Sequence, residues 1–111
     1  VCSSDLAYVY HFVKTNGRLG AWHSGEEVYC YGNIPAGSKL YNAADRELSE
    51  IFCSYFANFC KTGDPNGSGL PLWEPATDGT TVLELNETVA PVSDRFLPIY
   101  EFFDRMAELG N

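Results

Sequence analysis

Apolar residues cluster into four segments of the chain, and their spacing predicts two strands and two helices. Residues 7–13 are almost continuously apolar and rich in aromatic and β-branched types, which is typical of a strand buried on both faces in a parallel sheet. Residues 80–85 alternate weakly and are rich in strand formers, which predicts an edge strand. Glycine and proline dominate residues 63–80, which therefore form a long surface loop that Trp73 pins to the body of the protein.

The strongest periodic signal lies between Asn42 and Gly63. Apolar side chains recur there at the spacing of one buried helix face, at Leu48, Ile51, Phe52, Tyr55, Phe56 and Phe59. Asn42 can cap the start of this helix, and Gly63 can end it in the left-handed conformation, before Pro65 prevents continuation. A second helix is predicted after Pro91, with Pro98 near its first turn and a buried stripe of Phe96, Ile99, Phe102, Phe103 and Met106.

These four elements carry more apolar surface than they can bury among themselves. The first strand needs neighbours on both sides, and both helices have wide apolar stripes. We therefore expect residues 7–111 to be the C-terminal part of a larger α/β domain, completed by a missing N-terminal part of the same polypeptide. Residues 1–6, Val-Cys-Ser-Ser-Asp-Leu, can be encoded by the end of a common sequencing adapter, and we expect them to be non-native.

Composition and charge exclude several classes of function. The chain has 111 residues, 45% of them hydrophobic, and a formal net charge of −8, which fits a globular core and not a disordered tail. Because no Lys/Arg cluster occurs, we expect no nucleic-acid partner and no docking on anionic lipid. No apolar run approaches the roughly 20 residues that span a bilayer, so we expect no membrane span.

The cysteines give no sign of a metal site or a disulfide. Cys2, Cys30, Cys53 and Cys60 form no C-x-x-C pair, and no histidine stands at zinc-ligand spacing. Cys53 and Cys60 lie about 10 Å apart along the predicted helix, too far for a disulfide. We interpret them as small buried side chains, and unpaired thiols favour a reducing compartment, in this case the cytoplasm.

His23 follows the predicted strand on a loop, flanked by small residues. This is the place where α/β folds carry reactive groups, although a single histidine beside a tryptophan such as Trp22 is more often a packed, hydrogen-bonded side chain than a catalyst. His11 lies inside the strand and is interpreted as a packing residue. From the residues alone, the function of His23 stays open.

Three motifs resemble the type-B carboxylesterase family, the cholinesterase-like and para-nitrobenzyl-esterase-like branch of the α/β-hydrolases. They are Gly-Ala-Trp-His-Ser-Gly-Glu at 20–26 with Tyr-Gly-Asn at 31–33, Leu48-Ser49 leading into 55–66, and Leu-Pro-Leu-Trp-Glu-Pro at 70–75. They follow one another in register from about Ala7 to Met106. The resemblance implies the C-terminal portion of an α/β-hydrolase fold: a late sheet strand, the catalytic-histidine loop, an amphipathic helix, a long loop, an edge strand and a C-terminal helix.

The resemblance also implies roles for three residues. His23 would be the catalytic histidine of a Ser-His-Glu/Asp triad, because an imidazole can take a proton from serine and return it to the leaving alkoxide. The order in this fold, serine, acid, histidine, puts the other two members upstream, and no G-x-S-x-G occurs in these residues. Glu26 matches an acidic position of the family and would support the site or make a structural contact. Trp22 would line the substrate pocket or pack against the sheet, and Ser24 has no nucleophilic role.

The expected function is hydrolysis of a small-molecule carboxylic ester through an acyl-enzyme, by the full-length parent of this chain. No metal or organic cofactor is expected, and the 111 residues alone should be inactive. Two alternatives remain. The resemblance also allows a non-catalytic cholinesterase-like adhesion or binding protein, and the residues alone allow a small interaction domain that presents its apolar stripes to a partner.

Overall fold

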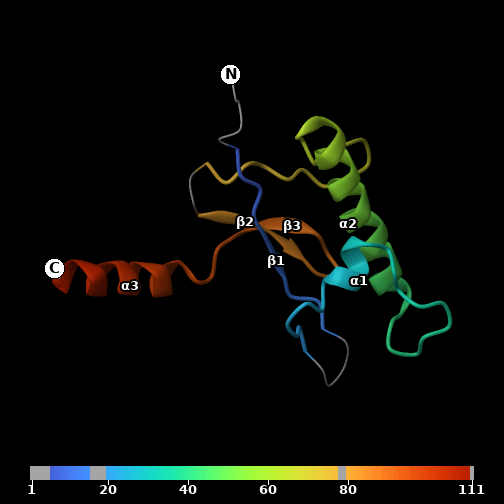
Figure 1. The fold of residues 1–111 in the computed structure, drawn as a ribbon, viewed down its shortest axis with the longest axis horizontal. Coiled ribbons are helices and arrows are strands. Elements are labelled where there is room, and N and C mark those ends of the chain that lie inside the picture. The colour runs from blue at the N-terminus through green and yellow to red at the C-terminus, as the bar shows by residue number, and fades with distance from the viewer. Residues whose placement is uncertain (1–5, 16–19, 78–79, 111) are drawn as a thin grey trace.

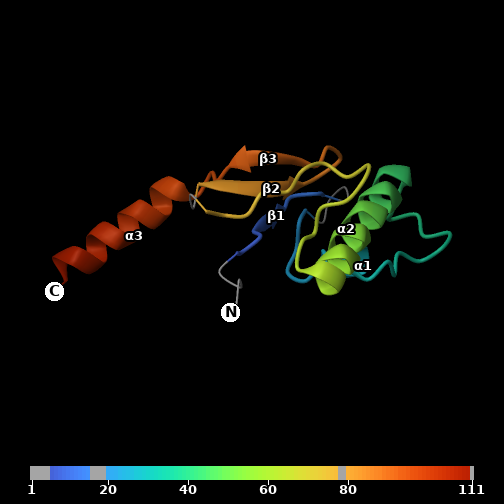
Figure 2. The same cartoon turned by 90° about the horizontal axis from the view of Figure 1, so that it is seen from above.

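The computed structural model describes residues 6–15, 20–77 and 80–110 as a three-stranded sheet with three helices (Figure 1). The elements follow one another along the chain as β1 (Tyr10–Phe12), α1 (Glu27–Cys30), α2 (Ala43–Thr62), β2 (Thr81–Leu85), β3 (Ala90–Ser93) and α3 (Leu97–Leu109). Helices α1 and α2 pack together on one side of the sheet, whereas α3 extends away from the other elements (Figure 2). Residues 1–5, on which most of the adapter expectation and Cys2 fall, lie outside the described residues.

The strand predicted over residues 7–13 is shorter and less buried than its sequence suggests. The strand β1 covers only Tyr10–Phe12 and pairs in parallel with β2, with Tyr10 opposite Leu83. It lies at one edge of the described sheet, and all three of its residues are half-buried. The prediction of a strand buried on both faces is therefore wrong for the described residues, because side chains on both faces of β1 stay partly exposed.

The strand predicted at residues 80–85 forms as β2, but it lies at the centre of the sheet and not at its edge. It pairs in parallel with β1 and antiparallel with β3, where Val82 stands opposite Val92. The consecutive Val82 and Leu83 are both buried, so both faces of β2 are covered. The prediction was wrong because β3, a short run containing Pro91, gives almost no strand signal in the sequence.

Helix α2 forms as predicted, including both ends. Asn42 Oδ1 accepts a hydrogen bond from Asp45 N at 3.1 Å, and Asp45 Oδ2 accepts one from Asn42 N at 2.7 Å, which is a reciprocal capping box. Gly63 ends the helix in the left-handed conformation with φ of 79°. Leu48, Phe52 and Tyr55 are buried, whereas Phe56 and Phe59 at the C-terminal end are 39% and 47% exposed.

The core lies between α2, the sheet and the loop after α2. It consists of Tyr29, Leu48, Phe52, Tyr55, Trp73, Leu83, Leu85 and Val89. Trp73 Nε1 donates a hydrogen bond to Val9 O at 3.2 Å, which confirms that Trp73 pins the loop. Burial raises the pKa of Tyr55 to about 12, so its hydroxyl stays protonated and donates to Pro71 O at 2.5 Å.

Helix α3 begins where Pro98 predicts, but its apolar stripe is not buried. Pro98 stands in the first turn, and no residue of α3 is buried in this chain. The radius of gyration is 16.4 Å, against about 13 Å for a compact domain of roughly this length. The predicted burial of the stripe is therefore wrong for the described residues, since apart from the contact of Phe96 with His11 the other described elements leave the stripe exposed.

The described cysteines are free thiols. Cys30 and Cys53 are half-buried and Cys60 is exposed. The interpretation of Cys60 as a buried side chain is wrong, because the helix turns it towards the same exposed side as Phe56 and Phe59. Within the described residues, none of the helices combines the length and the apolar character needed to cross a membrane.

Candidate functional site

His23 lies in a tight turn that leads into α1. Gly25 N donates a hydrogen bond to Trp22 O at 3.0 Å, and the intervening Ser24 has a φ of 60°. Residues with a side chain seldom adopt this left-handed conformation, and strained backbone of this kind is concentrated at functional sites. The imidazole of His23 is exposed, so the turn presents it to the surface.

Gly25 makes this turn possible. A Cβ at this position would lie 2.9 Å from Trp22 O and 3.2 Å from two atoms of the indole ring, closer than packed atoms tolerate. The Trp22 indole thus lies against Gly25 and is 38% exposed, so it is not buried against the sheet. A role for Trp22 in lining a substrate pocket stays a prediction.

Glu26 is half-buried and stands at the N-cap position of α1. Burial is the largest cause that raises the pKa of Tyr10, and the charge of Glu26 raises it further. Its side chain makes no cap hydrogen bond to α1, and none joins it to His23 in the described part of the chain. Support of His23 by Glu26 therefore stays a prediction. His11 packs its ring on Phe96 at 5.3 Å, as expected of a packing residue.

A buried polar cluster joins α1, α2 and the end of β1, and the sequence analysis missed it. Asp45 is 0% exposed and Lys14 is 5% exposed. Lys14 Nζ lies 3.1 Å from Asp45 Oδ1, and Tyr29 OH donates to the same oxygen at 2.8 Å. The capping pattern Asn42-x-x-Asp45 could have indicated the local bond, but no signal indicates that Lys14, 31 positions earlier in the sequence, completes the cluster.

Hydrogen bonds stabilise the charged form of Asp45. Burial by itself would raise its pKa, but the hydrogen bonds from Asn42 N, Tyr29 and Lys14, together with the charge of Lys14, hold the pKa below its ordinary value of 3.8. A group with a lowered pKa in the folded state contributes stability above its unfolded pKa and loses it as the pH falls.

We therefore expect the stability advantage of the native chain over Asp45→Asn to depend on pH. The difference in free energy of unfolding should be constant above about pH 5 and shrink as the pH falls below about 4, towards the folded pKa. Urea unfolding of both proteins between pH 6 and pH 3 measures it. A difference that stays the same across this range would contradict the charged state of Asp45.

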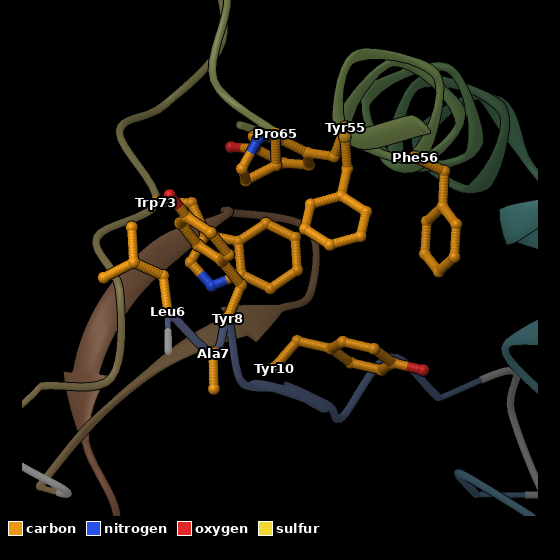
Figure 3. A pocket seen from close by; sticks show the side chains of 9 residues that line it. Leu6, Ala7, Tyr8, Tyr10, Tyr55, Phe56, Pro65 and Trp73 are labelled. Atoms are coloured by element: carbon orange, nitrogen blue, oxygen red, sulfur yellow. The ribbon is translucent and has the colours of Figure 1, made fainter. Parts of the chain in front are cut away.

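An apolar hollow of about 210 Å³ lies between the segment leading into β1, the C-terminal half of α2 and the following loop (Figure 3). Tyr55 turns its ring towards Trp73, with ring centroids 5.2 Å apart. The other lining residues are Leu6, Ala7, Tyr8, Tyr10, Phe56, Phe59 and Pro65. Tyrosine hydroxyls are its only titratable groups, so this hollow offers packing surface and no acid or base for catalysis near neutral pH.

The remaining described residues offer no second centre for chemistry. A hollow of about 280 Å³ beside α2 is lined by Gly32, Ile34, Arg46, Ser49, Glu50 and Cys53. Burial raises the pKa of the nearby Cys30 thiol, which disfavours a nucleophilic thiolate. No three His, Cys, Asp or Glu side chains among the described residues come together as metal ligands do. His23 is thus the strongest candidate for a reactive group.

Comparison with known proteins gives a consistent set of relatives. Residues 2–98 match the model of the carboxylesterase family. Bile salt-activated lipase of Rattus norvegicus is 33% identical over 79 residues, which are 68% of this chain and 13% of that protein. Among solved structures, the carboxylesterase EST55 of Geobacillus stearothermophilus superposes with a TM-score of 0.64 at 23% identity over 80% of this chain, and PNB esterase with 0.71 at 20% identity over 85%.

The chain corresponds to a small part of these proteins. It spans 13% of the lipase and 20% of each solved esterase. The structural likeness shows that the described helices and sheet have the arrangement of part of an α/β-hydrolase fold. The predicted fold class is therefore confirmed.

Proposed function

Because this chain belongs to the carboxylesterase family, we propose that the complete polypeptide hydrolyses small-molecule carboxylic esters and that His23 is its triad histidine. The observation that carries the proposal is the exposed imidazole in a strained turn, within the motif at residues 20–26 and beyond a strand of the parallel pair. The carboxyl ends of parallel strands are where α/β folds assemble their sites.

In the proposed reaction, His23 moves the proton at both steps. A serine from the upstream part of the polypeptide attacks the ester carbonyl while His23 accepts its proton, and His23 then donates that proton to the leaving alkoxide. An upstream acid orients the imidazole, and upstream backbone N–H groups stabilise the oxyanion. Neither a metal nor an organic cofactor is needed for this sequence of steps.

We propose further that residues 7–111 are the C-terminal part of the enzyme and depend on the upstream part for much of their packing. The unpaired edge of β1, the hollow with Phe56 and Phe59, and the stripe of α3 are apolar or hydrogen-bonding surfaces that the described residues leave uncovered. Strands at a sheet edge and exposed aromatic side chains are typical of surfaces that another segment covers.

The native reading frame upstream of Ala7 tests this proposal. We expect it to encode a G-x-S-x-G motif, followed by an acidic residue between that serine and His23, and to differ from the adapter-like codons of residues 1–6. A frame without the serine motif would contradict the enzyme and favour a non-catalytic relative with a binding function. A genuine start codon at Val1 would contradict the incomplete domain.

A further inference from the structure

Asp45 contacts residues on both sides of His23 in the sequence. Lys14, which follows β1, precedes His23 by nine positions, and Tyr29 on α1 follows it by six. Both contact the same carboxylate oxygen, Oδ1, at 3.1 Å and 2.8 Å. The second oxygen, Oδ2, accepts from Asn42 N at 2.7 Å. One buried carboxylate on α2 therefore holds the end of β1 and the helix that follows the His23 turn.

The His23 turn is connected to Tyr29 by successive hydrogen bonds. Glu27 N donates to Ser24 O at 3.2 Å, and Tyr29 N donates to Glu26 O at 3.0 Å. Tyr29 O in turn accepts from Ser49 Oγ on α2 at 2.9 Å. Because helical backbone is stiff over such a short distance, the contacts that hold Tyr29 of α1 against α2 set the direction in which the turn enters α1.

We propose that Asp45 is a positioning residue for His23: through Tyr29 and Lys14 it fixes α1 and the adjoining turn to α2 and β1. The effect of Asp45 on catalysis rests on the proposed function, whereas its effect on the order of the turn does not. Buried charged hydrogen bonds suit this role because they are directional, and displacing a buried charge from its partners is costly. A catalytic imidazole must be held within about 0.5 Å of its productive place.

The test compares two buried tyrosines in the native polypeptide that contains this chain. Tyr29→Phe removes only the hydroxyl that donates to Asp45 and keeps the ring, which packs on Phe12 at 5.0 Å. Tyr55→Phe is the matched control, because it removes one buried hydroxyl that donates to Pro71 O, away from the His23 turn. Hydrogen–deuterium exchange of peptides covering residues 20–28 is the measurement.

We expect Tyr29→Phe to speed exchange in residues 20–28 about tenfold, the effect of losing one hydrogen bond to a charged group. Exchange in β2 should stay unchanged, and Tyr55→Phe should leave residues 20–28 unchanged. Asp45→Asn should also speed exchange in residues 20–28, and by more than its general loss of stability speeds exchange in β2. In an active polypeptide, Tyr29→Phe should also lower kcat more than it alters KM.

Unchanged exchange in residues 20–28 in both Tyr29→Phe and Asp45→Asn would overturn the proposal. An equal increase throughout the chain would also overturn it, since that result indicates a general loss of stability. Failure of the proposed function would be visible separately, as a native polypeptide that orders this turn but hydrolyses no ester.

Discussion

Replacing His23 with glutamine is expected to lower kcat of the complete polypeptide for a nitrophenyl ester by a factor on the order of 10⁵ to 10⁶. Glutamine keeps a polar side chain but can neither accept the serine proton nor return it to the alkoxide. KM should change little, because the imidazole acts on the reacting atoms and not on the remainder of the substrate. Steady-state kinetics of the purified variant measure both constants.

His11 provides the matched control for this variant. It is the other histidine of the chain, is half-buried and packs on Phe96. We expect His11→Gln to keep kcat within about tenfold of the native value, because a packing change costs stability and removes no reacting group. Comparable losses in both variants would contradict a special role for His23.

The second large effect is expected at Phe52. Its side chain is 0% exposed and packs its ring on Tyr10 of β1 at 5.1 Å, so it joins α2 to the sheet. Phe52→Ala removes this buried ring and leaves a cavity, which should lower the free energy of unfolding by about 3–5 kcal/mol. Urea unfolding followed by the fluorescence of the buried Trp73 measures this loss.

Phe59 on the same helix is the control for Phe52. It is 47% exposed, so in the 111-residue chain Phe59→Ala should cost about 1 kcal/mol or less. In the complete polypeptide we expect the cost of Phe59→Ala to rise to about 3 kcal/mol, because the upstream part would bury this ring. An equally small cost in both would contradict the proposed packing of the upstream part on this surface.

The elements with strong local signals could be predicted from the sequence. The helix from Asn42 to Gly63 has its caps and apolar period within its own residues, so α2 was predicted at both ends. Trp73 was placed correctly because a tryptophan in a loop rich in glycine and proline has few alternatives to packing on the core. The position of His23 on a loop after a strand followed from the same local patterns.

Features that depend on contacts between segments far apart in the sequence could not be predicted. The central place of β2 depends on β3, whose short sequence is a weak strand signal. The exposed stripe of α3 has the same apolar period as a buried one, since periodicity shows which face is apolar and not what covers it. The cluster of Lys14, Tyr29 and Asp45 forms only where three segments of the chain come into contact, and no spacing in the sequence indicates that contact.

The most direct test of the central claim is the rate of nitrophenyl ester hydrolysis by the 111-residue chain and by the complete polypeptide, measured side by side. We predict that the chain alone is no faster than free imidazole, that the complete polypeptide turns over, and that His23→Gln abolishes that turnover. Turnover by the chain alone above free imidazole, or full activity of the complete polypeptide without His23, would contradict the claim that this chain supplies only the histidine of the triad.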